Sequence, residues 1–181
     1  MDIIEKTVKE NYIFRGKILN LRRDDIETAD GAPAIREVVE HNGGAAVIAL
    51  TDADEILLVR QYRYAVGRFM TEIPAGKLEL GENPADAVVR ELREETGARA
   101  EKVYPIGWLY VSPGYTTEKL YLYAAEGLSF GEQDLDPDEY LDVIRMPFDQ
   151  ALETALGEGF CDAKTDTAIL KLALLRNKNA K

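Results

Sequence analysis

The sequence predicts a mixed, β-rich protein of the α+β class or with α/β/α layers, with a small antiparallel β subdomain in front of it. Short apolar or alternating segments typical of strands occur along most of the chain, whereas helical patterns are confined to three segments. The pair Gly43-Gly44 interrupts the pattern. With 181 residues, the chain has room for one ordinary domain and a small appendage.

Residues 1–42 are expected to form the β subdomain. The segment Asp30-Gly31 supplies the turn residues that favour a hairpin between its second and third strands. The predicted strands are Thr7–Phe14, Lys17–Thr28 and Ala34–His41.

Residues 43–181 are expected to form the larger domain, with strands and helices arranged as α/β/α layers. A loop with a proline-glycine turn, Ser112–Glu118, lies between two of the strands. The predicted strands are Ala45–Leu50, Glu55–Tyr62, Val103–Val111, Lys119–Ala125 and Leu141–Met146, and the predicted helices are Pro84–Thr96, Phe148–Leu156 and Ala163–Arg176.

The composition limits the classes of function. The formal net charge of -11 repels nucleic acid and anionic membrane surfaces, so neither is an expected partner, and a phosphorylated substrate would need local cations. No run reaches the roughly 18 apolar residues of a membrane span, and the start of the chain lacks the apolar core of a signal peptide. A single cysteine, Cys161, excludes an internal disulfide framework and a cysteine-rich zinc site. We expect a cytoplasmic protein.

The segment Pro84–Thr96 is the most clearly bounded helix. Asn83 is a favourable N-cap, proline suits the first helical position, and Gly97 follows the end. At about 100° per residue, one side of this helix carries an apolar stripe. The stripe is made of Ala85, Val88, Val89 and Leu92.

Three glutamates of this helix border the apolar stripe. Glu91 and Glu95 lie directly beside it, and Glu94 is one step further round. Adjacent like charges in the last turns of a helix oppose folding. Arg90 can reach Glu94 but does not neutralise three carboxylates. A divalent cation would, and oxygen ligands suit Mg²⁺ or Mn²⁺. The alternative is a charged surface helix whose side chains merely pair.

The residues around this helix resemble the Nudix box. That motif is Gly, five residues, Glu, seven residues, Arg-Glu-aliphatic-any-Glu-Glu-any-Gly-aliphatic. Ala98 at the final aliphatic place is the one departure. The resemblance implies a Nudix α/β/α sandwich with hydrolase activity on phosphoanhydrides. The matching residues are Gly76, Glu82, Arg90, Glu91, Leu92, Glu94, Glu95 and Gly97.

Three further segments resemble the ADP-ribose pyrophosphatase branch of that family: Arg60–Arg63, Glu72–Gly76 and Ser112–Gly114. In this branch Pro113 would be a marker of substrate class, and the alternative is a plain turn between strands. The resemblance implies hydrolysis of ADP-ribose to AMP and ribose 5-phosphate. Other nucleoside-diphosphate sugars and the dinucleotides NADH and FAD are alternative substrates.

The resemblance also implies roles for individual residues. Glu91 and Glu95 would be direct metal ligands, and Glu94 a further ligand or a partner of a bridging water. The backbone carbonyl of Ala75 would complete the set around Mg²⁺, with Mn²⁺ possible. Arg90 would orient the glutamates, and Glu82 would be structural or contact the metal through water. The metal would lower the pKa of a bound water that attacks phosphorus.

The general base is expected from an acidic segment beyond the box, because members of this branch draw a catalytic glutamate from a mobile loop there. Glu139 is the first candidate and Asp138 the second. A solvated acidic loop is the alternative for either residue. The single histidine, His41, is expected to be a strand-end side chain, not a catalyst.

Local cations for a diphosphate are concentrated before the box, in Arg60, Arg63 and Arg68. Arg63 is the best phosphate candidate, because guanidinium geometry matches phosphate oxygens, and solvated ion pairs are the alternative. Glu72 would accept hydrogen bonds from ribose or adenine. The aromatic candidates for stacking on the base, which are core residues in the alternative interpretation, are Phe14, Tyr62 and Tyr115.

Similar proteins of this branch exchange their N-terminal β region between subunits and build the substrate site from both chains. We therefore expect a homodimer in which Met1 to His41 packs on the partner. A rival class is a module that senses ADP-ribose without cutting it. The presence of Glu91, Glu94 and Glu95 argues against that class.

Overall fold

The computed structural model describes residues 3–179, so Met1 and Asp2 of the predicted dimerising arm lie outside the described residues. The chain forms two compact units. The first extends to Gly43 and also contains Tyr110–Lys119, a segment that the contiguous boundary expected from the sequence leaves out. The second contains Gly44–Leu109 and the chain from Leu120 onward.

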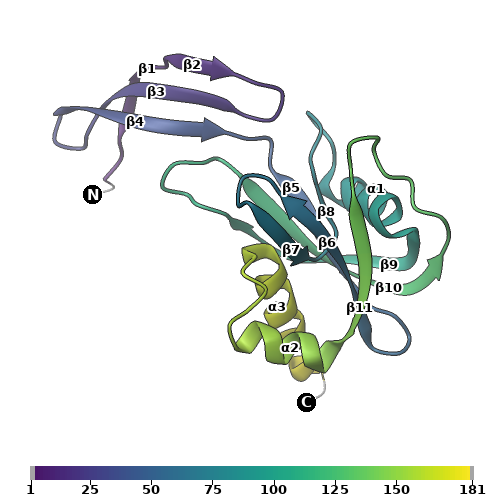
Figure 1. Ribbon diagram of the computed structural model, residues 1–181. Coiled ribbons are helices and arrows are strands. Elements are labelled where there is room, and N and C mark those ends of the chain that lie inside the picture. Colours follow the sequence, from purple (N-terminus) through teal and green to yellow (C-terminus); the bar gives the residue numbers. More distant parts are fainter. Residues whose placement is uncertain (1–2, 180–181) are drawn as a thin grey trace. The chain divides into compact units, whose positions relative to one another are not determined.

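The first unit is an antiparallel sheet of β1 (Lys6–Lys9), β2 (Tyr12–Arg15), β3 (Asn20–Glu27) and β4 (Pro33–Glu40). Strand β3 pairs with β4 along one edge and with β1 and β2 along the other (Figure 1). The prediction of a single strand over Thr7–Phe14 is therefore wrong, because the strand is interrupted at Asn11, between β1 and β2. The Asn11 side chain donates to the carbonyl of Arg23 at 3.1 Å and to Asp25 at 3.1 Å.

The segment Tyr110–Lys119 joins this sheet beside β4. The backbone N–H of Val39 donates to the carbonyl of Tyr115 at 2.7 Å, and Thr117 N–H donates back to Val39 at 3.0 Å. His41 at the end of β4 accepts a hydrogen bond from Gly43 N–H through Nδ1, at 3.0 Å. The imidazole thus stabilises the turn that follows β4.

The second unit has two sheets. One has the order β8-β5-β10-β9, with β5 parallel to β10 and antiparallel to β8; the other has the order β11-β6-β7 and is antiparallel. Short strands β7 and β8 were not predicted, because Pro74 interrupts the segment between them. The strands are β5 (Gly44–Ala49), β6 (Glu55–Arg63), β7 (Arg68–Glu72), β8 (Ala75–Lys77), β9 (Ala98–Tyr110), β10 (Lys119–Phe130) and β11 (Leu141–Pro147).

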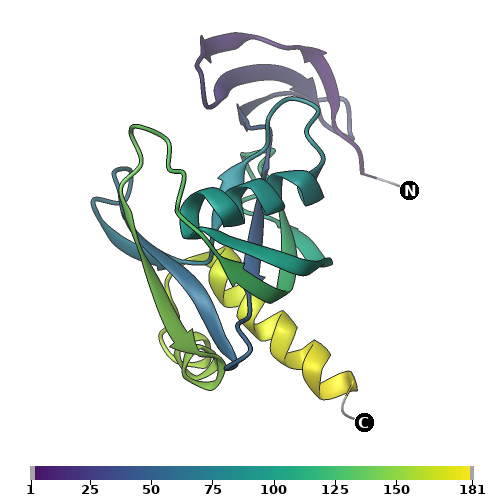
Figure 2. The same cartoon turned by 90° about the vertical axis from the view of Figure 1, so that its right-hand side faces the viewer.

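The three helices are α1 (Pro84–Thr96), α2 (Phe148–Leu156) and α3 (Ala163–Asn179). Side chains of β5 alternate between the two faces of its sheet. Ala45, Val47 and Ala49 pack with α1, whereas Ala46 and Ile48, together with Leu50 just after the strand, pack with α2 and α3. The helices therefore cover opposite faces (Figures 1 and 2), which confirms the α+β sandwich predicted from the sequence.

One residue of the predicted apolar stripe on α1 is misplaced. Val89 is 52% exposed, whereas Ala87, Val88 and Leu92 are buried against the sheet. The buried stripe is therefore turned toward Ala87 and toward the glutamates. In residues 3–179, no helix has both the length and the apolar character needed to cross a membrane.

Candidate metal and substrate site

Helix α1 is fixed at both ends, which sets the position of its glutamates. The Asn83 side chain accepts a hydrogen bond from Ala85 N–H at 2.9 Å, and Gly97 N–H donates to the carbonyl of Arg93 at 2.8 Å. Gly97 has φ 69°, a left-handed conformation that favours glycine. A Cβ there would also lie 2.4 Å from the carbonyl oxygen of Gly131.

Two of the three glutamates are buried. Glu95 is 3% exposed and Glu91 is 8% exposed, so neither lies on a solvated surface helix. Burial raises the pKa of Glu95 to about 8, although the hydrogen bond from Ala75 N–H at 2.9 Å acts to lower it. Burial also raises the pKa of Glu91, against the attraction of Arg90. The fold thus places two carboxylates where a proton or a cation must compensate their charge.

Arg90 connects the remaining acids. Its guanidinium donates to Glu91 at 2.7 Å, to Glu94 at 3.0 Å and to Glu82 at 3.2 Å. Glu82 also accepts a hydrogen bond from Glu79 N–H at 2.9 Å, so it braces the loop before α1. This arrangement agrees with an orienting role for Arg90 and a structural one for Glu82.

Gly76 lets the loop approach the carboxylates. A Cβ at this position would lie 1.7 Å from Oε1 of Glu91, closer than any real contact. The neighbouring Ala75 N–H meets Glu95, so both buried glutamates lie against one short stretch of backbone. The donor set is all oxygen, which fits Mg²⁺ or Mn²⁺.

Within residues 3–179, no three His, Cys, Asp or Glu side chains form a ready metal cluster. Arg90 forms ion pairs with Glu91 and Glu94 in this arrangement. The predicted ligand set, Glu91, Glu94, Glu95 and the carbonyl of Ala75, combines side chains with main chain. The burial of Glu91 and Glu95 and the close approach of Glu91 to the backbone at Gly76 fit such a cation.

The acidic segment beyond β10 is attached to the end of α1. Asp134 N–H donates to the carbonyl of Glu94 at 3.0 Å, and the Gln133 side chain donates to the carbonyl of Glu95 at 2.6 Å. Glu139 is exposed, and its charge contributes to the raised pKa of both Glu91 and Glu95. Glu139 is therefore within electrostatic range of the buried carboxylates.

A second cluster of charges lies beside the carboxylates. Glu72 is 2% exposed and accepts two hydrogen bonds from Arg63, at 2.8 and 2.7 Å, and one from Lys164. Burial acts to raise the pKa of Glu72, but Arg63 and Lys164 outweigh it and lower this pKa to about 2. Both oxygens of Glu72 are thus engaged by cations, which favours a positioning role over the direct contact with ribose or adenine expected from the sequence.

The other substrate candidates are more dispersed. Arg60 lies 3.7 Å from Asp142 and stacks over the Phe69 ring, and Tyr62 packs edge-on against the same ring. Arg68 donates to the sulfur of Met70. Phe14, Pro113 and Tyr115 belong to the first unit, so their contribution to the site stays a prediction.

Sequence reasoning missed the residues at the start of α3. Lys164 and Thr165 are buried, and Lys164 pairs with Glu72 across 92 positions of sequence. The only local signal is Asp162, an acid three residues before a threonine at a helix start, which is typical of an N-cap. Nothing local indicates that Lys164 returns to Glu72.

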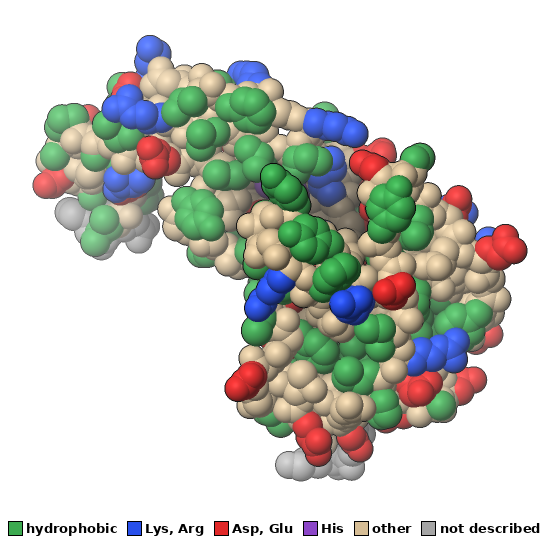
Figure 3. All heavy atoms as spheres, viewed as in Figure 1, with side chains coloured by type: hydrophobic (Ala, Val, Ile, Leu, Met, Phe, Trp, Pro, Cys, Tyr) green, Lys and Arg blue, Asp and Glu red, His purple; other side chains and the backbone are tan. Residues whose placement is uncertain are grey.

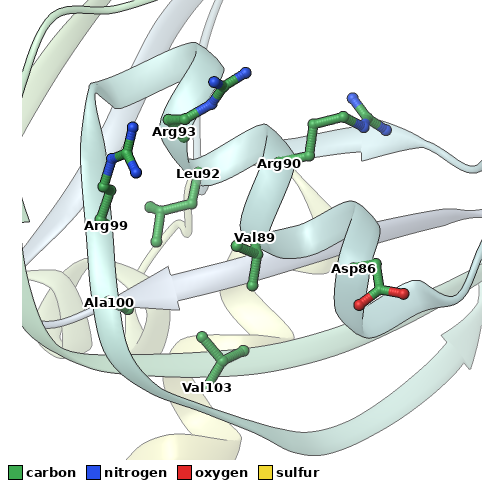
Figure 4. A pocket seen from close by; sticks show the side chains of 8 residues that line it. All are labelled: Asp86, Val89, Arg90, Leu92, Arg93, Arg99, Ala100 and Val103. Carbon is green, nitrogen blue, oxygen red and sulfur yellow. The ribbon is translucent and has the colours of Figure 1, made fainter.

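A surface groove of about 630 Å³ lies between α1 and the beginning of β9 (Figure 4). Its lining residues Arg90 and Arg93 donate hydrogen bonds to glutamates of α1, but Glu91, Glu94 and Glu95 do not line it. The groove therefore lies outside the candidate site. Its lining residues are Asp86, Val89, Arg90, Leu92, Arg93, Arg99, Ala100 and Val103.

Comparisons with known proteins agree with this geometry. The NUDIX domain family matches residues 40–162, and the nucleoside diphosphate sugar hydrolase N-terminal domain matches residues 5–39. An ADP-ribose pyrophosphatase of Bacillus subtilis is 42% identical over 94% of this chain and 93% of its own. A methanol dehydrogenase activator of Bacillus methanolicus has the same identity and coverage.

Two further matches have lower sequence identity. A GDP-mannose pyrophosphatase of Cronobacter sakazakii is 32% identical over 95% of this chain and 94% of its own. A crystal structure of an ADP compounds hydrolase superposes with a TM-score of 0.84, at 20% identity, over 97% of this chain and 95% of that one. That last likeness bears on the fold alone.

Replacing Gly76 by alanine should weaken cation binding, because the added methyl group occupies the position of the Glu91 carboxylate. We expect the Mn²⁺ affinity measured by calorimetry to fall about tenfold or more, the scale seen when ligands are misoriented. Gly157→Ala is the matched control, since its Cβ would lie 3.4 Å from the nearest atom. Unchanged affinity in Gly76→Ala would show that Glu91 does not bind the cation.

The raised pKa of Glu95 predicts a pH dependence of stability. Between the ordinary value of 4.5 and about 8, the folded protein keeps a proton that the unfolded chain releases. In chelator, the contribution of Glu95 to the free energy of unfolding should therefore fall as pH rises across that window. Denaturant titrations of the wild type and Glu95→Gln should diverge accordingly, and Mn²⁺ should reduce the slope. Parallel curves for the two proteins would contradict the assignment.

Proposed function

Since the chain belongs to the Nudix family, we propose that it is a Mg²⁺-dependent pyrophosphohydrolase that cleaves ADP-ribose to AMP and ribose 5-phosphate. The observation that carries the proposal is the pair of buried glutamates, Glu91 and Glu95, packed against the Gly76 loop. Mn²⁺ is the alternative cation. The cytoplasm is the proposed location, in keeping with a single, exposed cysteine.

The choice of ADP-ribose is supported by relatives named ADP-ribose pyrophosphatase, among them one from Bacillus subtilis and one, at 40% identity over 68% of this chain, from Mycobacterium tuberculosis. GDP-mannose is a second candidate, because the relative from Cronobacter sakazakii spans nearly the whole chain. A nucleoside diphosphate linked to a sugar is common to both.

Each residue of the site would have a separate role in the hydrolysis. Glu91, Glu94, Glu95 and the Ala75 carbonyl would hold the cation, which would supply charge neutralisation at the phosphates and a lowered pKa for a bound water. Glu139 accepts the proton of the attacking water, and its range to both buried carboxylates supports this role. Arg63 binds phosphate oxygens, and Arg90 keeps the glutamates in register. Water adds across the anhydride, so that one oxygen–phosphorus bond forms and the bridging one breaks.

A homodimer is the proposed assembly, with the first unit as the contact. In the described part of that unit, Ile26 is the only buried core residue. A sheet with so few buried apolar side chains has little core of its own, and its exposed apolar surface is typical of a contact with another chain. Figure 3 shows hydrophobic side chains on the surface of the first unit, and the exposed ones of this unit include Val8, Ile13, Phe14, Ile18 and Ile35.

Glu95→Gln should remove turnover while keeping the fold, because the amide is nearly isosteric but carries no charge for the cation. We expect a loss of about a hundredfold or more, the scale for removing a charge-stabilising group. The exposed Glu101→Gln is the control.

Hydrolysis of ADP-ribose, GDP-mannose, NADH and FAD in ¹⁸O-water would identify the substrate and the bond attacked. Full activity in Glu95→Gln would refute the ligand assignment, and inertness toward ADP-ribose would refute the substrate.

Sedimentation should show a dimer with about twice the chain mass of 20.2 kDa. Phe14→Asp should shift it toward monomer and lower activity, because a charge would be buried in the contact. Leu156→Asp, at an exposed apolar position on α2, should change neither property. A fully active wild-type monomer at assay concentration would overturn the proposed assembly.

A further inference from the structure

The first turn of α3 is built around one carboxylate. Asp162 accepts hydrogen bonds from Thr165 through the backbone N–H at 3.2 Å and the hydroxyl at 2.5 Å. It also lies 3.0 Å from the ammonium group of Lys164. The cap of the helix thereby fixes the direction in which Lys164 extends.

This turn holds the strand segment that leads to the metal loop. Lys164 pairs with Glu72, and the Thr165 hydroxyl accepts a hydrogen bond from Ile73 N–H at 2.9 Å. Two residues further on, Ala75 N–H donates to Glu95 of α1. The stretch from Glu72 to Ala75 is therefore fixed by helices on both sides of the sheet.

Arg63 depends on the same contacts. Its Nε and Nη2 atoms donate to Glu72, whereas Nη1 has no hydrogen-bond partner among residues 3–179. The Arg63 side chain is 41% exposed, and its charge acts to lower the pKa of Glu95, so the guanidinium is within electrostatic range of that buried carboxylate and keeps one edge free. That edge is available to an anion.

The charges of the cluster balance only when Lys164 is present. Arg63 and Lys164 carry two positive charges, and Glu72 and Asp162 carry two negative ones. Without Lys164 the cluster would carry one net negative charge. Glu72 would also lose one of the two cations that hold it in a buried position.

We propose that Lys164 is a positioning residue for substrate binding, which acts through Glu72 to keep the free edge of Arg63 ready for the diphosphate. This inference rests on the proposed function. It predicts that loss of Lys164 affects binding of the diphosphate more than the chemical step, since Lys164 is buried and acts on Arg63 through Glu72.

The kinetic test compares Lys164→Met, the milder Lys164→Gln and the control Lys171→Met on the same helix. With ADP-ribose and Mg²⁺, KM should rise about tenfold in both Lys164 variants, while kcat changes by less than about threefold. Lys164→Arg should restore part of the KM. In an Arg63→Ala background, Lys164→Met should raise KM less than about twofold further. Equal KM in Lys164→Met and Lys171→Met, or an undiminished effect without Arg63, would overturn the proposal.

A substrate-free readout separates this inference from the proposed function. The ¹⁵N NMR signal of Arg63 Nε–H reports its hydrogen bond to Glu72 in the full chain. Exchange of this proton with water should be about tenfold faster in Lys164→Gln than in the wild type or Lys171→Met. Unchanged exchange would overturn the positioning role. If the wild type cleaves none of the nucleoside diphosphate compounds, the proposed function fails while the exchange rates still decide the role of Lys164.

Discussion

The burial of two neighbouring carboxyl groups is the constraint on which the site depends. Glu91 and Glu95 lie one turn apart on α1 and border its contact with the sheet, so water cannot solvate either carboxylate fully. Arg90 offsets part of the charge at Glu91, whereas Glu95 meets a single backbone N–H. Proteins keep such an arrangement where charge is needed for chemistry. A bound cation would convert this unfavourable feature into a functional one.

The same constraint shapes the loop between β7 and β8. Gly76 is required because the Glu91 carboxylate occupies the space of a side chain, and Ala75 N–H is committed to Glu95. The other end of the loop is fixed from α3, through Lys164 and Thr165. Helices from opposite faces of the sandwich thus hold one stretch of backbone, and this places Arg63 beside the carboxylates. The same stretch of backbone therefore connects the buried glutamates of α1 with the charged residues Arg63 and Lys164.

Much of this was predictable from local sequence. Helix α1 was bounded correctly by Asn83 and Gly97, since caps are local signals, and its glutamates were identified by spacing. Val89 was wrongly expected to be buried. The spacing of apolar residues shows that a helix has an apolar face, but it does not show which residues at the border of that face contact the sheet. Strands β7 and β8 were missed because they are short and flank Pro74. The contact of Lys164 with Glu72 had no signal at all, because only the tertiary fold brings positions 92 residues apart together.

Anomalous diffraction from crystals grown with Mn²⁺ is the most direct measurement of the central claim. The account predicts a manganese peak between Glu91 and Glu95, within coordination distance of the Ala75 carbonyl, with Arg90 released from Glu91. A manganese-free pocket at millimolar concentration, with Arg90 still bound to Glu91, would contradict it.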